Sequence, residues 1–90
     1  MTSIVQDLST NRCFRCGAWV NLDLHHIMHG TANRRLSTKH GLTCWLCRDC
    51  HVLVHCDILE NRRLQKQAQT AFEREHTRRE WMEIFKKNYL

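Results

Sequence analysis

Two Cys-x-x-Cys pairs constrain this chain more than any other feature of its sequence. Cys13 and Cys16 form the first pair, and Cys47 and Cys50 form the second. Four thiolates at this paired spacing can saturate one tetrahedral zinc ion. A chain of 90 residues buries only a limited core, so a bound metal ion contributes directly to folding. The sequence therefore predicts a small domain stabilised by a structural Zn²⁺.

The six cysteines allow more than one pairing. Residues 1–12 are polar and contain no apolar core of signal-peptide length, so we expect a soluble intracellular protein with metal-bound thiolates. Disulfides are the alternative if the protein is secreted. Cys44 and Cys47 also have the spacing of a ligand pair, but Cys44 falls in an expected strand, where cysteine often packs as a small apolar residue. We expect Cys56 to be a free thiol in the core.

Basic residues are concentrated in one stretch of the chain. The net charge is +5, and residues 31–48 contain no Asp or Glu. The basic residues of this stretch are Arg34, Arg35, Lys39 and Arg48. Such a local excess favours an anionic partner such as nucleic acid. The alternative is an ordinary solvated basic surface.

Residues 13–56 predict short strands and a helix around a metal-binding turn. Residues 19–24 alternate apolar and polar and predict a half-buried strand, and residues 42–46 predict a second one. Residues 30–41 are polar and basic and predict a loop, with a helical turn over 33–40 as the alternative. A helix should begin at Arg48 and bury residues 52–54.

The remaining sequence, residues 57–90, predicts two helices. Leu64, Ala68, Ala71 and Phe72 form an apolar stripe at helical spacing. Thr77 and Glu80 match a capping box, and Trp81, Ile84 and Phe85 then form the buried face of a final helix. The expected organisation is a polar lead-in over 1–12, a zinc-stabilised core over 13–56, and a helical extension over 57–90 packed on that core. The fold class is a small, metal-stabilised α+β domain.

Four histidines lie at positions that a structural zinc site does not need. His25 and His26 are adjacent, so their side chains should point to opposite sides of a strand. His51 directly follows Cys50, and His55 lies one helical turn further on the same face. Imidazole is a good ligand for divalent cations and a good general base near neutral pH. The spacing therefore suggests a second, functional metal site.

The stretch from Cys13 to His55 resembles the HNH endonuclease family, whose fold is the ββα-metal finger. The motifs that carry this resemblance are Cys13-x-x-Cys16, Leu24-His25-His26-Ile27, Asn33-Arg34-Arg35-Leu36-Ser37 and Leu46-Cys47-x-x-Cys50-His51. Small phage and prophage members also carry a tail similar to the stretch from residues 64–68 through residues 85–89, so the resemblance covers most of the chain. It implies a bacteriophage or prophage protein in the cytoplasm of a bacterial host.

The resemblance also implies roles for individual residues. His25 and His51 would bind the catalytic cation, and His26 would be the general base. His55 would complete the cation shell or contact the scissile phosphate. The family's middle asparagine has no counterpart at its usual spacing, where this chain has residues 42–43, so Asn33 is the candidate for that role.

The implied activity is hydrolysis of DNA phosphodiester bonds, with Arg34, Arg35, Lys39 and Arg48 holding the DNA backbone. The cation would be Mg²⁺, Mn²⁺, Ni²⁺ or Zn²⁺, and the imidazoles favour a borderline metal over Mg²⁺. Nicking and double-strand cleavage both remain open. A short chain offers little surface for a long recognition site, which allows a homodimer or guidance by another phage protein.

Two other functions remain as alternatives. One is a non-catalytic zinc module that binds nucleic acid or a protein partner. The other is a structural subunit whose C-terminal helices dock a larger phage protein.

Overall fold

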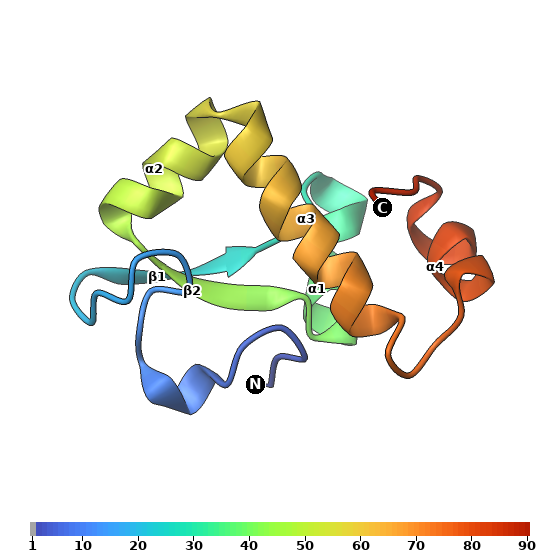
Figure 1. The fold of residues 1–90 in the computed structure, drawn as a ribbon, viewed down its shortest axis with the longest axis horizontal. Coiled ribbons are helices and arrows are strands. Elements are labelled where there is room, and N and C mark those ends of the chain that lie inside the picture. The colour runs from blue at the N-terminus through green and yellow to red at the C-terminus, as the bar shows by residue number, and fades with distance from the viewer. Residues whose placement is uncertain (1) are drawn as a thin grey trace.

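Residues 2–90 form a small α+β domain with two antiparallel strands and four α-helices (Figure 1). The computed structural model describes residues 2–90, and Met1 of the expected lead-in lies outside them. The elements follow the order η1 (Leu8–Thr10), β1 (Leu22–His26), α1 (Thr31–His40), β2 (Thr43–Cys47), α2 (Arg48–Cys56), α3 (Ile58–Phe72) and α4 (Arg78–Phe85). None of the helices within residues 2–90 has the length and apolarity that crossing a membrane requires.

The strand pair places the histidines and cysteines in a fixed register. His25 pairs with Cys44, His26 with Thr43, and Leu22 with Cys47. Because β2 ends at Cys47 and α2 begins at the next residue, no linker separates the sheet from the helix. Both expected strands are present, but β1 begins three residues later than the expected 19–24 segment. Trp19 is 66% exposed before it.

The segment 30–41, expected as a loop, is mostly the helix α1, so that prediction was wrong. The sequence pattern missed α1 because it carries one large apolar residue and no apolar stripe. A polar side chain anchors it instead: the buried Ser37 hydroxyl accepts a hydrogen bond from the Met28 N–H at 3.0 Å and donates one to the Met28 carbonyl at 3.1 Å. Gly41 ends α1 at φ 70°, a conformation that glycine adopts without strain.

The N-terminal segment lies along β2. The Trp45 N–H donates to Gln6 Oε1 at 2.8 Å, the indole N–H of Trp45 donates to the Leu8 carbonyl at 2.8 Å, and the Phe14 N–H donates to the Trp45 carbonyl at 2.7 Å. These bonds satisfy backbone groups that an uncovered strand edge would expose.

The helix α2 presents three different faces. Val54 is buried in the core at 1% exposure, as predicted, whereas Val52 is 59% exposed and Cys56 is exposed. The predictions that Val52 and Cys56 are buried were therefore wrong. The two residues are four apart and share the outer face of α2, while His51 and His55 occupy a third face.

The last two helices pack as their sequence patterns predicted. The stripe on α3 is buried, and Thr77 and Glu80 form both hydrogen bonds of the capping box of α4. Trp81 is fully buried, with its ring centre 4.2 Å from that of Phe85 and 5.4 Å from that of Phe72. These side chains belong to the same apolar cluster as residues of the strands and of α2.

Candidate metal centres

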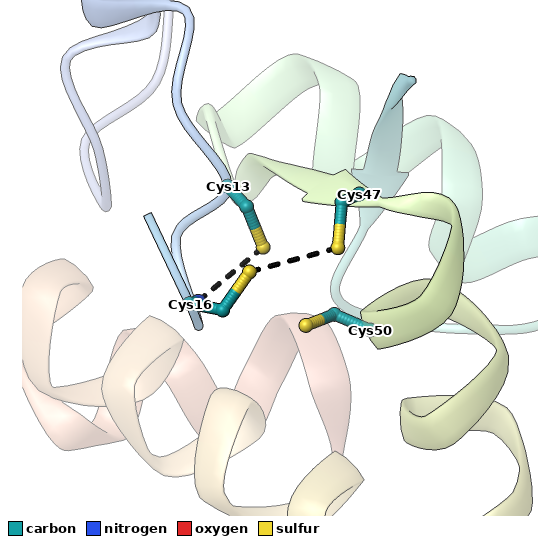
Figure 2. A group of neighbouring side chains, drawn as sticks. All are labelled: Cys13, Cys16, Cys47 and Cys50. Atoms are coloured by element: carbon teal, nitrogen blue, oxygen red, sulfur yellow. Dashed lines mark hydrogen bonds between the residues drawn. The ribbon is translucent and has the colours of Figure 1, made fainter. Parts of the chain in front are cut away.

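The four-cysteine cluster consists of Cys13, Cys16, Cys47 and Cys50, whose Sγ atoms all lie within 4.8 Å of one another. Figure 2 shows the four side chains converging from a turn, the end of a strand and the start of a helix. None of the six cysteines, all within residues 2–90, forms a disulfide. Four thiols in this arrangement are consistent with a structural zinc site, as the spacing predicted.

The turn that carries Cys13 and Cys16 is shaped by backbone hydrogen bonds. The Gly17 N–H donates to the Cys13 carbonyl at 2.9 Å, and Gly17 has a φ of 83°, which favours glycine. Burial opposes ionisation of Cys13, but hydrogen bonds from the backbone N–H groups of Cys47, Cys16 and Arg15 lower its pKa to about 6. At Cys13 the turn therefore favours the thiolate that a metal ion needs.

Arg15 connects the four-cysteine cluster to α3. Its Nη1 lies 3.6 Å from Cys50 Sγ, and its Nε lies 3.2 Å from Glu60 Oε2.

Cys44 lies outside the four-cysteine cluster and is fully buried. Burial, and then the neighbouring Cys13, raise its pKa to about 12. Cys44 therefore behaves as the small apolar residue that the sequence predicted.

A second set of donors, the histidine trio, consists of His25, His51 and His55. Their ring nitrogens lie within 4.8 Å of one another. His25 comes from β1 and is 2% exposed, whereas His51 and His55 come from consecutive turns of α2. The trio therefore brings three nitrogen donors close enough to share one cation.

His25 supplies an observation that favours a bound cation. Its Nε2 is buried and has no hydrogen-bond partner among the described residues. An unpartnered buried polar atom costs free energy, and a bound cation is one way to satisfy it. Burial, followed by the neighbouring His29, lowers the pKa of His25 to about 3. The ring is therefore neutral at physiological pH, the state in which imidazole binds metals.

The trio opens into the histidine hollow, a space of about 440 Å³. Its lining includes His25, His26, His29, Arg34, His51 and His55. His26 follows His25 on β1 yet lines the same hollow, which places it beside the trio. Burial, and then the charge of Arg34, lower the pKa of His26.

The other predicted site residues lie outside this hollow. Asn33 is half-buried on α1 and does not line it. Arg35 is exposed on α1, and Lys39 lines a separate hollow beside Phe72. Arg48 is the exposed first residue of α2, and its Nη2 lies 3.4 Å from Asp23 Oδ1. The four basic residues therefore do not converge on one point, and Arg34 is the member that lines the histidine hollow.

Sequence reasoning missed three residues of this site: Asp23, His29 and Asn61. Asp23 Oδ2 lies 3.2 Å from His51 Nδ1, and Arg48, then His51, lower the Asp23 pKa. The sequence could have predicted Asp23 as a site residue, because Asp23 and His25 are two apart on a strand and therefore share a face. His29 lies 2.9 Å from Asn61 through Nε2 and Oδ1, and no local pattern connects residues 32 positions apart.

Comparisons with protein-family models, curated proteins and solved structures found no match for this chain.

Proposed function

We propose that this protein is a metal-dependent DNA endonuclease of the HNH type, built on a ββα-metal finger formed by β1, β2 and α2. The observation that carries the proposal is the histidine hollow. There, three nitrogen donors that can share a cation lie beside a fourth histidine and an arginine. Metal-assisted phosphodiester hydrolysis requires a water molecule, a cation and a phosphate group. In the hollow, His26 could contact the water, the histidine trio the cation and Arg34 the phosphate.

His25, His51 and His55 would hold the cation. A divalent cation there would stabilise the negative charge that develops on the phosphate and on the leaving 3′-oxygen. Asp23 would orient His51, since a ligating imidazole commonly donates its other N–H to a carboxylate. The four-cysteine cluster would hold Zn²⁺ and fix the start of α2, from which His51 projects.

His26 would act as the general base. It lines the hollow without belonging to the trio, so its ring is free to accept a proton from water. Arg34 lines the same hollow and carries a permanent positive charge with several N–H donors. It would hold the phosphate while His26 activates the attacking water. Such contacts bind the DNA backbone and give no sequence readout by themselves.

The test is incubation of purified protein with supercoiled plasmid and a panel of Mg²⁺, Mn²⁺, Co²⁺, Ni²⁺ and Zn²⁺. We expect nicked or linear product with at least one cation. His26→Ala should lower the cleavage rate by about 10²–10⁴-fold while leaving the zinc content unchanged. His76→Ala is the matched control, because His76 pairs with Glu80 on α4, outside the hollow. Cleavage by His26→Ala at the wild-type rate would falsify the assignment of the base.

A non-catalytic zinc module remains the second candidate, and one observation favours it. Trp19 is 66% exposed next to the cysteine turn, and the Arg12 guanidinium lies 4.2 Å from the centre of its ring. An exposed aromatic with a basic neighbour can stack on a nucleic-acid base or contact a protein partner. One bound zinc per chain and no cation-dependent nicking would favour this function over the endonuclease.

A further inference from the structure

His29 lies beside the histidine trio and lines the same hollow. Its ring centre is 5.2 Å from that of His25 and 5.4 Å from that of His55. Within the trio, the corresponding separations are 4.8 Å for His51–His55 and 5.2 Å for His25–His51. The spacing of His29 from its neighbours therefore matches the spacing inside the trio.

This spacing is what a shared ion would produce. A metal–nitrogen bond of about 2.0–2.1 Å places an imidazole ring centre about 3 Å from the ion, so two rings on one tetrahedral ion lie about 5 Å apart. Five of the six pairs among His25, His29, His51 and His55 meet this condition, with ring centres 4.8–5.7 Å apart. The ring nitrogens of His29 lie outside the group of donors within 4.8 Å of one another, so His29 would move toward the ion on binding.

Asn61 fixes the orientation of the His29 ring. The Asn61 Oδ1 lies 2.9 Å from His29 Nε2, and an amide oxygen only accepts hydrogen bonds. His29 Nε2 therefore carries the proton, and Nδ1 keeps its lone pair. His51 has the same arrangement, with its Nδ1 beside Asp23 Oδ2 and its Nε2 free. Metal-bound histidines typically donate their second N–H to such an oxygen.

We propose that His29 is a fourth imidazole ligand of the cation site and that Asn61 is its positioning residue. The inference rests on the cation site of the proposed function and extends it to α3, which carries Asn61. A site of four neutral nitrogens should select a first-row transition cation such as Co²⁺, Ni²⁺ or Zn²⁺ over Mg²⁺, which prefers oxygen ligands. Zn²⁺ can expand to five ligands, so four imidazoles would still leave a position for a phosphate oxygen.

The first test measures Co²⁺ binding to protein that already holds one zinc in the four-cysteine cluster. The visible absorption of Co²⁺ reports occupancy of the second site. We expect His29→Ala to weaken Co²⁺ binding at least about tenfold, and Asn61→Ala to weaken it by about 10–100-fold, the range for a residue that orients a ligand. His76→Ala should bind as the wild type does, and millimolar Mg²⁺ should not displace Co²⁺. Unchanged Co²⁺ affinity in His29→Ala would overturn the proposal.

A second measurement on the wild-type chain avoids any dependence on how the variants fold. Nitrogen-15 spectra of the histidine rings, recorded as Zn²⁺ fills the second site, should show His29 Nδ1 move to a metal-bound shift while Nε2 keeps its proton. A His29 ring that does not respond would contradict the assignment.

The two proposals fail in different experiments. Co²⁺ binding that depends on His29, in a protein that never nicks plasmid, would support the ligand and reject the nuclease. Cation-dependent nicking with Co²⁺ affinity independent of His29 would reject the ligand and leave the nuclease standing.

Discussion

The four-cysteine cluster and the histidine trio differ in how many donors the chain brings together. Cys13 and Cys50 are buried and Cys16 is exposed, and four thiolates from one chain can complete a tetrahedral shell. The trio runs from the buried His25 to the exposed His55 and opens into a hollow. Four thiolates would leave no position for a substrate on a tetrahedral ion, whereas the histidine site borders a hollow that can admit water and a phosphate. Two candidate metal sites therefore meet at the adjacent residues Cys50 and His51.

Removing one thiol should have the largest effect, because it breaks the closed site. We expect Cys47→Ser to lose zinc and most of its ordered structure, since the binding energy of a structural zinc is folding energy. Zinc content and circular dichroism measure this loss. Cys56→Ser is the control, because Cys56 is exposed and lies outside the cluster. A fully folded, zinc-free Cys47→Ser protein would show that apolar packing alone maintains the domain.

Replacing the carboxylate beside the trio should affect the open site alone. We expect Asp23→Asn to weaken Co²⁺ binding at the second site by about 10–100-fold, because Asp23 contacts His51 Nδ1. The zinc in the four-cysteine cluster should remain. Asp49→Asn is a suitable control, since Asp49 is an exposed acid in the first turn of the same helix. Loss of both metals in Asp23→Asn would mean that the two sites are not separable.

Arg34 and Arg35 form a matched pair for the proposed phosphate contact. They are neighbours on α1, but Arg34 lines the histidine hollow and Arg35 does not. We expect Arg34→Ala to weaken DNA binding and to reduce the salt dependence of the binding constant by about one unit of slope. Arg35→Ala should change both quantities less. Equal effects would indicate a diffuse basic surface with no defined phosphate position.

The smallest effect is expected at Thr43, on the strand between the two sites. Its hydroxyl is buried without a hydrogen-bond partner among the described residues, and Thr43 pairs with His26 across the sheet. Thr43→Val should leave the free energy of unfolding unchanged or raise it by up to about 1 kcal/mol, because the unpaired hydroxyl is removed. Chemical denaturation measures the difference. A loss of stability would show that the Thr43 hydroxyl has a hydrogen-bond partner in solution.

The parts of this molecule that the sequence predicted share a local signal. Cys13 and Cys16 are joined by one turn, and the capping box of α4 spans four residues. In both patterns the interacting residues are separated by a fixed, short distance in the sequence. The four-cysteine set was confirmed for this reason, and the pairing of His51 with His55 follows from a single helix.

The parts that the sequence missed depend on tertiary packing or on polar anchors. The helix α1 is held by hydrogen bonds between the Ser37 hydroxyl and the Met28 backbone. A search for apolar periodicity does not detect such a polar contact. The pairing of His29 with Asn61 joins residues 32 positions apart and exists only because the first turn of α3 lies beside the connection between β1 and α1. The exposure of Val52 was not predicted, because in a short helix the buried face is decided by the elements that pack against it.

The register of β1 against β2 has a consequence for how this chain tolerates insertions. Successive residues of a strand face opposite sides, so a slip by one position would exchange the places of His25 and His26. One inserted residue in β1 would thus swap the proposed ligand and the proposed base while leaving every motif intact in the sequence. The helical connection α1 joins the strands at their ends, so a change in its length leaves their pairing unaltered. Length variation should therefore be more harmful in the five-residue strand β1 than in the ten-residue helix α1.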